Sequence, residues 1–243
     1  MRVYIHTPDR SPYSINRQVA LVGFTLRGED IQLFEPEQFD DLPLTLDDIV
    51  VGGVGFVHRA IKRLGLPMPT LDSIPPSLME FAGRKLWQST MLEARRTVEK
   101  GQPIFVKPHA TQLKRFKAKP LREFSDLLAT SHVPDELIVE CSEVTPFLSE
   151  FRVFVMHGEI VGVRQYNGDH LLFPDPARVK AAVAAFEEAP SAYALDFGVC
   201  EDGRTLVVEV NDGYAIGSYG LAPVIYAALI DARWSQLRQS KTA

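Results

Sequence analysis

Cysteine is scarce in this chain of 243 residues, which holds only Cys141 and Cys200. Two cysteines are too few for a disulfide framework, and this favours a reducing compartment. Basic charge is not in excess either, because 26 Lys and Arg face 31 Asp and Glu, for a formal net charge of −5. A protein that coats nucleic acid or lies on an anionic membrane needs a broad basic surface. We therefore expect neither nucleic acid nor a membrane as a partner.

Long apolar runs are missing as well. The longest apolar-rich stretch, residues 221–230, is too short to span a bilayer. The first ten residues contain no apolar segment of a signal peptide, and no internal repeat or low-complexity tract is visible. The chain is 46% hydrophobic and 23% charged, as ordinary globular proteins are. We expect a soluble, cytoplasmic protein.

Short apolar strands alternate with helical patterns in the first 75 residues. The expected strands are residues 3–5, 31–34 and 49–51, and the expected helices are residues 14–26 and 56–64. Strands that alternate with helices are typical of a small parallel sheet. Four prolines between residues 66 and 76 mark the end of this region.

The rest of the chain changes from mixed to antiparallel patterning. A helix is expected at about 87–99 and a strand at 104–107. Beyond these, the expected strands are residues 136–141, 151–156, 159–166, 193–200 and 205–210, and the expected helices are residues 177–188 and 221–238. Short turns at His157-Gly158 and at residues 201–203 join two pairs of these strands into hairpins. The overall fold class is α/β.

The strongest signal for chemistry is the second of these hairpins. Asp196 lies on its first strand, and Glu209 and Asn211 lie two residues apart on its second. The two-residue period of a strand puts Glu209 and Asn211 on one face, and the turn brings Asp196 across from them. Oxygen ligands of this kind suit Mg²⁺. A solvated position is the simpler interpretation of each residue alone, but the three together favour a metal site.

Lysines beside strands give a second signal. Lys107 ends the apolar strand, and Lys85 precedes the expected helix; either alone is typical of a surface lysine with a buried stem. Four more basic residues follow between 114 and 119, with no acidic residue from 103 to 121. Such charges bind phosphate, although a solvated basic loop has the same composition. The turn at residues 52–55 lacks the Gly-Lys-Ser/Thr ending of a P-loop, so we interpret it as structural.

Acidic residues after the strand at 136–141 give a third signal. Glu140 closes an apolar run whose backbone groups can meet the edge of a purine, and Glu143 and Glu150 follow it. A carboxylate at this place can accept hydrogen bonds from ribose hydroxyls. Each of these acids, taken singly, is more often a solvated surface residue.

In this order, the segments resemble the ATP-grasp superfamily of carboxylate–amine ligases. Lys85 and Lys107 come first, the acidic segment at 138–150 follows, and Asp196 with Glu209-Val210-Asn211 comes last. The Asp…Glu-x-Asn ending is the most specific part. The resemblance covers about residues 77–243. Its sequence motifs are similar to those of a clade of small bacterial and phage members thought to be amidoligases.

The resemblance implies an ATP-grasp fold, in which two α+β subdomains clasp ATP, preceded by a small Rossmann-like domain. We place this pre-ATP-grasp domain at residues 1–76 and the ATP-grasp domain at residues 77–243. The two subdomains are expected at about 77–140 and 141–243.

The resemblance also implies a set of site residues. The implied ATP-binding residues are Lys85, Lys107, Lys114, Glu140, Cys141, Val144 and Glu150. The implied ligands of two Mg²⁺ ions are Asp196, Glu209 and Asn211. The implied catalytic residues are Arg152 and Arg164. Apart from the resemblance, the segment at residues 213–220 follows the metal-binding strand, so substrate contacts are expected there, at Ser218 and Tyr219; a plain turn is the alternative interpretation.

Within that set, Lys85 and Lys107 are expected at the α- and β-phosphates. The resemblance also implies that the backbones of Cys141 and Val144 face adenine, with Glu140 near its amino group, and that Glu150 faces the ribose.

The sequence departs from the family in two places. The phosphate-covering loop is usually rich in Gly and Ser, but residues 109–114 here are His-Ala-Thr-Gln-Leu-Lys, and the charges of Lys114 and Lys117 are expected to compensate. The arginine that many members carry two residues before the metal-binding Asp is Ala194 here. Arg164 is the candidate to replace it at the γ-phosphate.

The expected activity is amide-bond formation from a small-molecule or peptide carboxylate and an amine, through an acyl phosphate, with ATP and Mg²⁺. A non-catalytic ATP-binding sensor and an ATP-dependent phosphotransferase are the alternatives. The scattered histidines show no paired Cys or Ser, so no nucleophilic side chain is expected. The final helix packs either in the core or against a second copy, which leaves monomer and homodimer open.

Overall fold

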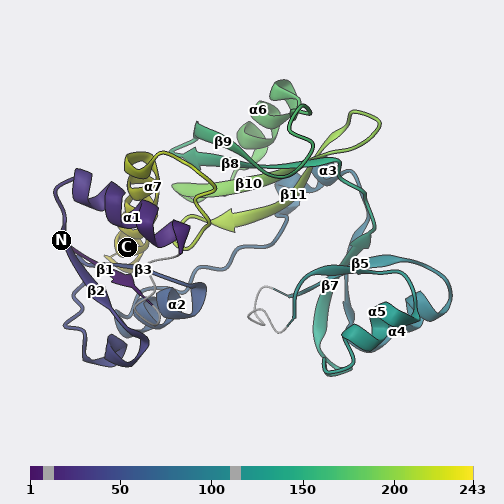
Figure 1. The fold of residues 1–243 in the computed structure, drawn as a ribbon, viewed down its shortest axis with the longest axis horizontal. Helices are drawn as coiled ribbons and strands as arrows, with labels where there is room; N and C mark the ends of the chain where they lie inside the picture. Colours follow the sequence, from purple (N-terminus) through teal and green to yellow (C-terminus); the bar gives the residue numbers. More distant parts are fainter. Residues whose placement is uncertain (8–13, 110–115, 243) are drawn as a thin grey trace.

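The computed structural model describes residues 1–7, 14–109 and 116–242. Within these residues the chain forms three sheets, each in a different part of the sequence, as Figure 1 shows. The strand orders are β2-β1-β3, β4-β7-β5-β6 and β11-β10-β8-β9. The architecture is the mixed α/β one that the sequence predicted.

The first sheet is parallel, as expected, and belongs to the N-terminal region. Its strands are β1 (Arg2–His6), β2 (Asp30–Phe34) and β3 (Ile49–Val51). The helices of this region are α1 (Ile15–Leu26), the short 3-10 helix η2 (Pro36–Asp41) and α2 (Val54–Arg63). Gly53 is the N-cap of α2, so the glycine turn at residues 52–55 carries the chain from β3 into that helix.

The second sheet is antiparallel and is covered by two helices on one face. Its strands are β4 (Leu86–Thr90), β5 (Ile104–Pro108), β6 (Lys119–Leu121) and β7 (Ile138–Glu143). Helices α4 (Met91–Glu99) and α5 (Phe124–Ala129) cover it, whereas η3 (Pro76–Leu78) and α3 (Met79–Ala82), which precede β4, pack against the third sheet. Met91, Ala94 and Leu127 from α4 and α5 pack on Val106 and Val139 of the sheet.

The predicted helix at 87–99 is wrong in its first part. Residues 86–90 form β4, which pairs with β7 along its whole length, and α4 begins only at Met91. Thr90 caps that helix, since its hydroxyl oxygen accepts a hydrogen bond from the Glu93 N–H. Lys85 therefore precedes a strand. Pairing with a distant strand outweighed the local helical pattern here.

The third sheet is antiparallel and contains both predicted hairpins. Its strands are β8 (Ser149–Met156), β9 (Glu159–Gly168), β10 (Ala192–Val199) and β11 (Thr205–Asp212). The last two helices are α6 (Pro176–Ala185) and α7 (Pro223–Thr242). One face of the sheet packs on α6 through Val155, Leu195 and other apolar residues.

The other face of this sheet is divided. At one end, Phe154, Ala192 and Ala194 join the apolar core that the N-terminal region shares with α7. Two residues further along their strands, the same face carries Arg152 and Asp196. The apolar core therefore ends where the charged residues begin.

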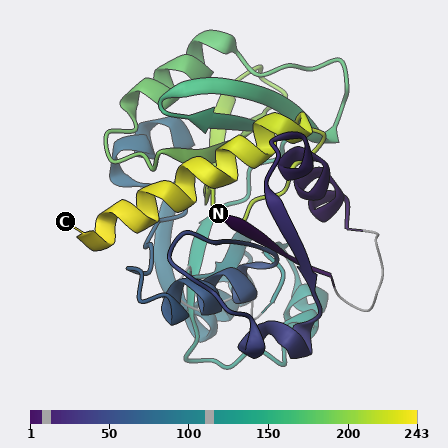
Figure 2. The same ribbon diagram turned by 90° about the vertical axis from the view of Figure 1, so that its left-hand side faces the viewer.

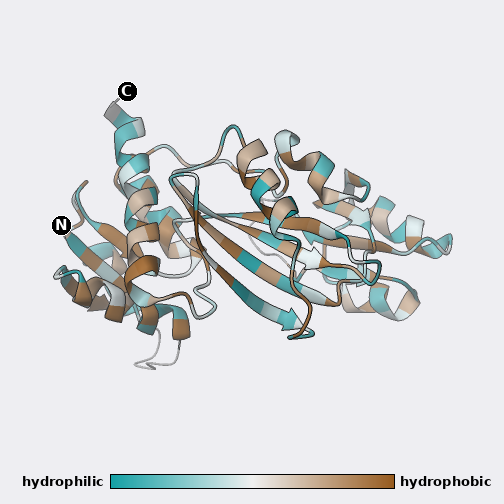
Figure 3. Ribbon diagram, turned by 90° about the horizontal axis from the view of Figure 1, so that it is seen from above, coloured by the Kyte–Doolittle hydropathy of each residue, from teal (hydrophilic) through white to brown (hydrophobic). Residues whose placement is uncertain are grey.

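Helix α7 belongs to the core of this chain. Trp234 and Leu229 are fully buried in the cluster that contains the N-terminal sheet, and Figure 2 shows α7 crossing close to α1. Figure 3 shows that its residues become more hydrophilic toward the C-terminus. None of the helices in the described residues combines the length and apolar character that crossing a bilayer requires.

Candidate active site

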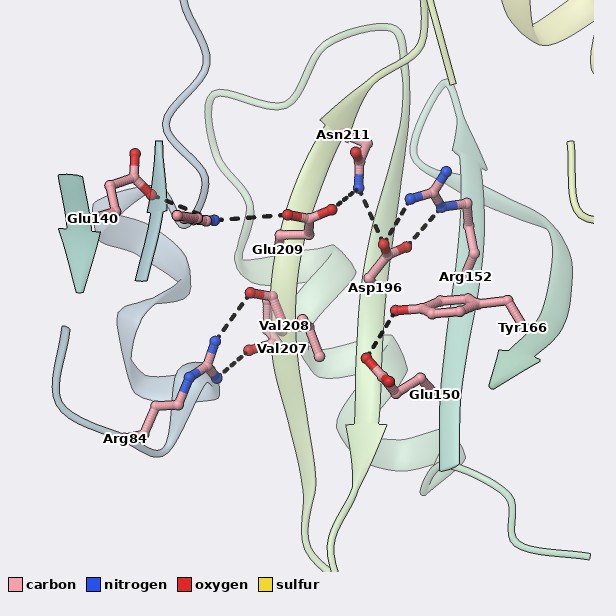
Figure 4. A network of polar contacts seen from close by, with 11 residues as sticks. Arg84, Glu140, Glu150, Arg152, Tyr166, Asp196, Val207, Val208, Glu209 and Asn211 are labelled. Atoms are coloured by element: carbon pink, nitrogen blue, oxygen red, sulfur yellow. Dashed lines mark hydrogen bonds and ion pairs between the residues drawn. The ribbon is translucent and has the colours of Figure 1, made fainter. Parts of the chain in front are cut away.

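The three predicted metal ligands lie together on β10 and β11. Asp196 pairs directly with Glu209, and a bulge follows, in which Val208 has no partner on β10. The Asn211 amide nitrogen lies 3.2 Å from Asp196 Oδ2 and 3.2 Å from Glu209 Oε1, so it donates to both acids (Figure 4). The structure thus brings together on one face the three side chains that the strand period placed there.

Arg152 of β8 holds Asp196 from the other side. Its Nε and Nη2 atoms donate to the two carboxylate oxygens at 2.7 and 2.6 Å, and both side chains are almost completely buried. Burial raises the pKa of Asp196 to about 6, and the hydrogen bonds from Arg152 oppose that rise. Burial also disfavours the charged guanidinium, but its hydrogen bonds and the charge of Asp196 raise the pKa of Arg152 overall. The pair is therefore ionised at neutral pH.

Lys107 joins this cluster from the second sheet. Its Nζ atom lies 3.4 Å from Glu140 Oε2 and 3.7 Å from Glu209 Oε2. Glu140 is on the neighbouring strand, directly opposite Lys107, whereas Glu209 belongs to the third sheet. One ammonium group therefore bridges the carboxylates of two sheets.

Arg84 is a residue that sequence reasoning missed. Its guanidinium donates to the carbonyl of Ala82 at 3.0 Å and to those of Val207 and Val208 at 2.8 and 3.0 Å; Figure 4 shows the latter two bonds. It thereby binds the bulged backbone immediately before Glu209, and burial lowers its pKa. A lone arginine beside Lys85 carries no sequence signal for this role, because the two β11 carbonyls that it binds lie 123 and 124 residues away.

Tyr166 is a second residue that the sequence did not single out. Its hydroxyl donates to Glu150 Oε2 at 3.1 Å, and Asn167 Nδ2 donates to Oε1 of the same carboxylate at 2.7 Å. Glu150 and Arg152 lie two residues apart on β8, so the acid expected at the ribose lies on the same face of the sheet as Arg152 (Figure 4). Burial raises the pKa of Tyr166 far above its ordinary value.

The predicted substrate residues lie in the loop between β11 and α7. Ser218 is buried, and its backbone N–H and its hydroxyl both donate to Asn16 Oδ1, at 2.8 and 3.0 Å. Tyr219 places its ring over the guanidinium of Arg152, 4.7 Å from ring centroid to Cζ. Arg164 donates to the carbonyl of Gly220 at 3.0 Å. The loop therefore contacts both α1 and the charged face.

The other predicted residues lie within the second sheet or next to its strands in the chain. Lys85 precedes β4, with its Nζ 5.7 Å from the centroid of the Trp87 ring. Cys141 is buried inside β7, between β4 and β5, and Val144 is the first residue after β7. Within the described residues, none of these three forms a hydrogen bond or an ion pair with Asp196 or Glu209. Lys114 lies outside the described residues.

The oxygen ligands on this face suit a hard cation that is bound together with phosphate. Within the described parts of the chain, no three His, Cys, Asp or Glu side chains form a metal-binding group. Two carboxylates and one amide are what this face supplies, and Mg²⁺ commonly takes few protein ligands and completes its shell with water and phosphate oxygens. A cavity of about 500 Å³ lies elsewhere, between the β8–β9 turn and α7, and its described lining includes none of the predicted site residues.

Comparison with known proteins identifies the fold and the family of the chain. Solved ATP-grasp structures share the fold of the whole chain. Residues 81–229 match the family described as ATP-grasp domain, R2K clade family 2, and the chain belongs to that family. No curated protein sequence matches it significantly.

Three solved structures illustrate the shared fold. D-alanine–D-alanine ligase from Bacillus anthracis is 15% identical, with 99% of each chain covered and a TM-score of 0.58. D-cycloserine synthetase DcsG is 13% identical over 96% of this chain and 100% of its own, with a TM-score of 0.63. A RimK domain ATP-grasp protein from Sphaerobacter thermophilus is 16% identical over 100% of both, with a TM-score of 0.60.

Proposed function

We propose that this chain is an ATP-dependent ligase that joins a carboxylate to an amine. The observation that carries the proposal is the cluster of Lys107, Arg152, Asp196, Glu209 and Asn211 on facing elements of an ATP-grasp fold. Relatives in fold include a D-alanine–D-alanine ligase and a D-cycloserine synthetase. A cluster of this kind neutralises phosphate charge and needs no nucleophilic side chain.

The proposed reaction has two steps. A substrate carboxylate oxygen attacks the γ-phosphorus of ATP, and the bond to the β–γ bridging oxygen breaks, which gives an acyl phosphate and ADP. An amine nitrogen then attacks the acyl carbon, phosphate leaves, and the nitrogen loses a proton to give the amide. Positioning and charge neutralisation are what the protein contributes to such phosphoryl transfer.

Each charged side chain has a part in this proposal. Lys107 leaves its two carboxylates to contact the phosphates, assisted by Lys85 at the α-phosphate. The free Nη1 side of Arg152 faces the γ-phosphate. Asp196, Glu209 and Asn211 hold Mg²⁺, which supplies electrophilic stabilisation of the phosphate oxygens when bound. For this, the Asn211 amide turns to present Oδ1, because its nitrogen now donates to both acids.

The remaining predicted residues complete the proposed site. The segment from Glu140 through Cys141 to Val144 contacts the nucleotide base, and Glu150 faces its sugar. Ser218 and Tyr219 border the substrate. We also propose that residues 1–76 form the pre-ATP-grasp domain, which shares its apolar core with α7, and that residues 77–243 form the ATP-grasp domain.

The substrates are proposed only as a class. PsnB, an ATP-grasp ligase of the same fold with a TM-score of 0.52, was solved with a minimal precursor, Mg and ADP. Peptides are therefore tested beside amino acids and small carboxylates. Light scattering on the same preparation measures whether the protein is a monomer or a homodimer.

The test is ADP release with Mg²⁺ and ATP in the presence of pooled carboxylates and amines. Glu209→Gln removes one charge of the cluster and is expected to abolish turnover and weaken Mg-ATP binding. Glu201→Gln, on the exposed turn of the same hairpin, is the matched control and is expected to behave as wild type. Phosphorylated product without amide would show a phosphotransferase instead. Absence of Mg-ATP binding by the wild type in calorimetry would refute the site.

A further inference from the structure

Tyr219 has an unusual backbone conformation beside the charged face. Its φ angle is 42°, and in the described residues only His157 shares a positive φ without being glycine. A bulky residue in the left-handed region is strained, and such strain persists only where the surroundings hold it. The surrounding structure therefore holds the Tyr219 side chain in place against an unfavourable backbone conformation.

Two anchors on either side of Tyr219 hold that conformation. On one side, the Asn16 side chain accepts two hydrogen bonds from Ser218. On the other, the Arg164 guanidinium donates to the carbonyl of Gly220. A Cβ atom on Gly217 would lie 2.8 Å from the Tyr219 ring, so the ring also lies directly against that glycine.

The ring so held covers one face of the Arg152 guanidinium and packs against the Tyr166 ring in a tilted arrangement, with ring centroids 5.1 Å apart. Asp196 binds two donor atoms of the same guanidinium along its edge. Among the described residues, no acceptor binds its third nitrogen, Nη1. Asp196 therefore fixes the position of the guanidinium within its own plane, and the Tyr219 ring fixes the tilt of that plane. One nitrogen, Nη1, is left to donate.

We propose that Tyr219 and Arg164 are positioning residues that hold Arg152 in place for the γ-phosphate of ATP. Arg164, which lies opposite Arg152 on the neighbouring strand, acts through the loop and not on the phosphate. This inference rests on the proposed function. Without the ring, Arg152 keeps its bond to Asp196 but loses its fixed tilt, and its free nitrogen no longer meets the phosphate oxygen.

The test compares two nucleotides by calorimetry in Mg²⁺: ADP and a non-hydrolysable β,γ-imido analogue of ATP. Tyr219→Asn lacks the ring but tolerates the left-handed conformation, so the loop keeps its path. Arg164→Ala removes the anchor at Gly220. Each variant is expected to lose about tenfold in affinity for the ATP analogue, as for one charge-assisted hydrogen bond, while ADP affinity is retained.

Conservative variants and a control complete the design. Tyr219→Phe and Arg164→Lys are expected to restore most of the preference for the ATP analogue, since a ring and a donor are present again. Arg178→Ala is the control, because Arg178 likewise donates from its guanidinium to an exposed backbone carbonyl, that of Glu80, far from this loop in sequence.

Three outcomes separate the hypotheses. A loss of affinity for the ATP analogue with unchanged affinity for ADP supports the inference. Equal losses for both nucleotides, or no loss in either variant while the wild type binds both, overturn it and leave the proposed function standing. A wild type that binds neither nucleotide overturns the proposed function itself, and the inference with it.

Discussion

Arg152 and Asp196 lie opposite each other on adjacent antiparallel strands and form a bidentate ion pair that is almost completely buried. The pair sits where the apolar core of the third sheet ends and the charged face begins. Transfer of both charges out of water is costly, so such a pair contributes little net stability, whereas loss of one partner leaves an uncompensated buried charge. Its presence at this position is explained better by function than by stability.

Removal of Arg152 alone is expected to destabilise the fold strongly. We predict that Arg152→Met lowers the free energy of unfolding by about 3–5 kcal/mol, because Asp196 stays buried without its partner. The double variant Arg152→Met with Asp196→Leu is expected to recover most of that loss. Urea unfolding measures both. Arg204→Met, which breaks an exposed pair with Asp202, is the control and is expected to leave the free energy of unfolding almost unchanged. A double variant as unstable as the single one would contradict this account.

Arg84 is expected to stabilise the backbone that carries Glu209. Arg84→Met leaves the carbonyls of Ala82, Val207 and Val208 without this donor, and we predict a loss of about 2–3 kcal/mol. Chemical unfolding gives the magnitude, and Arg178→Met, with one carbonyl acceptor, is the comparison. If both variants lost the same small amount of unfolding free energy, the three hydrogen bonds of Arg84 would not contribute to stability.

Two glycines with similar backbone angles test the role of steric space. Gly28 has a φ of 76° and no atom within 4 Å of the place that a Cβ would take, while a Cβ on Gly168 would overlap the carbonyl of Leu148. We predict that Gly28→Ala costs about 1 kcal/mol, from backbone strain alone. Gly168→Ala is expected to cost more than about 3 kcal/mol, because backbone must move at the β8–β9 pairing. Thermal unfolding ranks the two, and equal costs would refute the predicted clash.

His6 makes the stability of the fold depend on pH. Burial first, and then the positive charge of Arg17, lowers the pKa of His6 to about 4 from 6.5. Between these values the unfolded chain binds a proton that the folded chain does not, so acidification favours unfolding. This contribution is complete above pH 6.5 and is lost as the pH falls toward 4.

We therefore predict that unfolding free energy falls by about 2 kcal/mol from pH 7 to pH 5 through this residue. His6→Gln is expected to remove that part of the slope, which urea titrations at the two pH values measure. An unchanged slope in the variant would show that other groups cause the pH dependence.

Local patterning was sufficient for much of the fold. The period of the apolar residues predicted the parallel strands β1–β3 and both hairpins of the third sheet. It also placed Asp196, Glu209 and Asn211 on one face, because neighbours across a short turn are determined by the strand period. It did not predict β4, since residues 86–90 become a strand only by pairing with β7, which lies much later in the chain.

The tertiary structure alone decided how the charged residues meet. Lys107 reaches Glu209 from another sheet, Arg84 binds carbonyls of β11, and Tyr219 covers Arg152. These contacts join residues that lie far apart in sequence, and each depends on how separate sheets and loops pack. The sequence by itself determined that Asp196, Glu209 and Asn211 share one face, because alternation along a strand is local. Packing determined which of them touch, because the distance between two elements is a property of the whole fold.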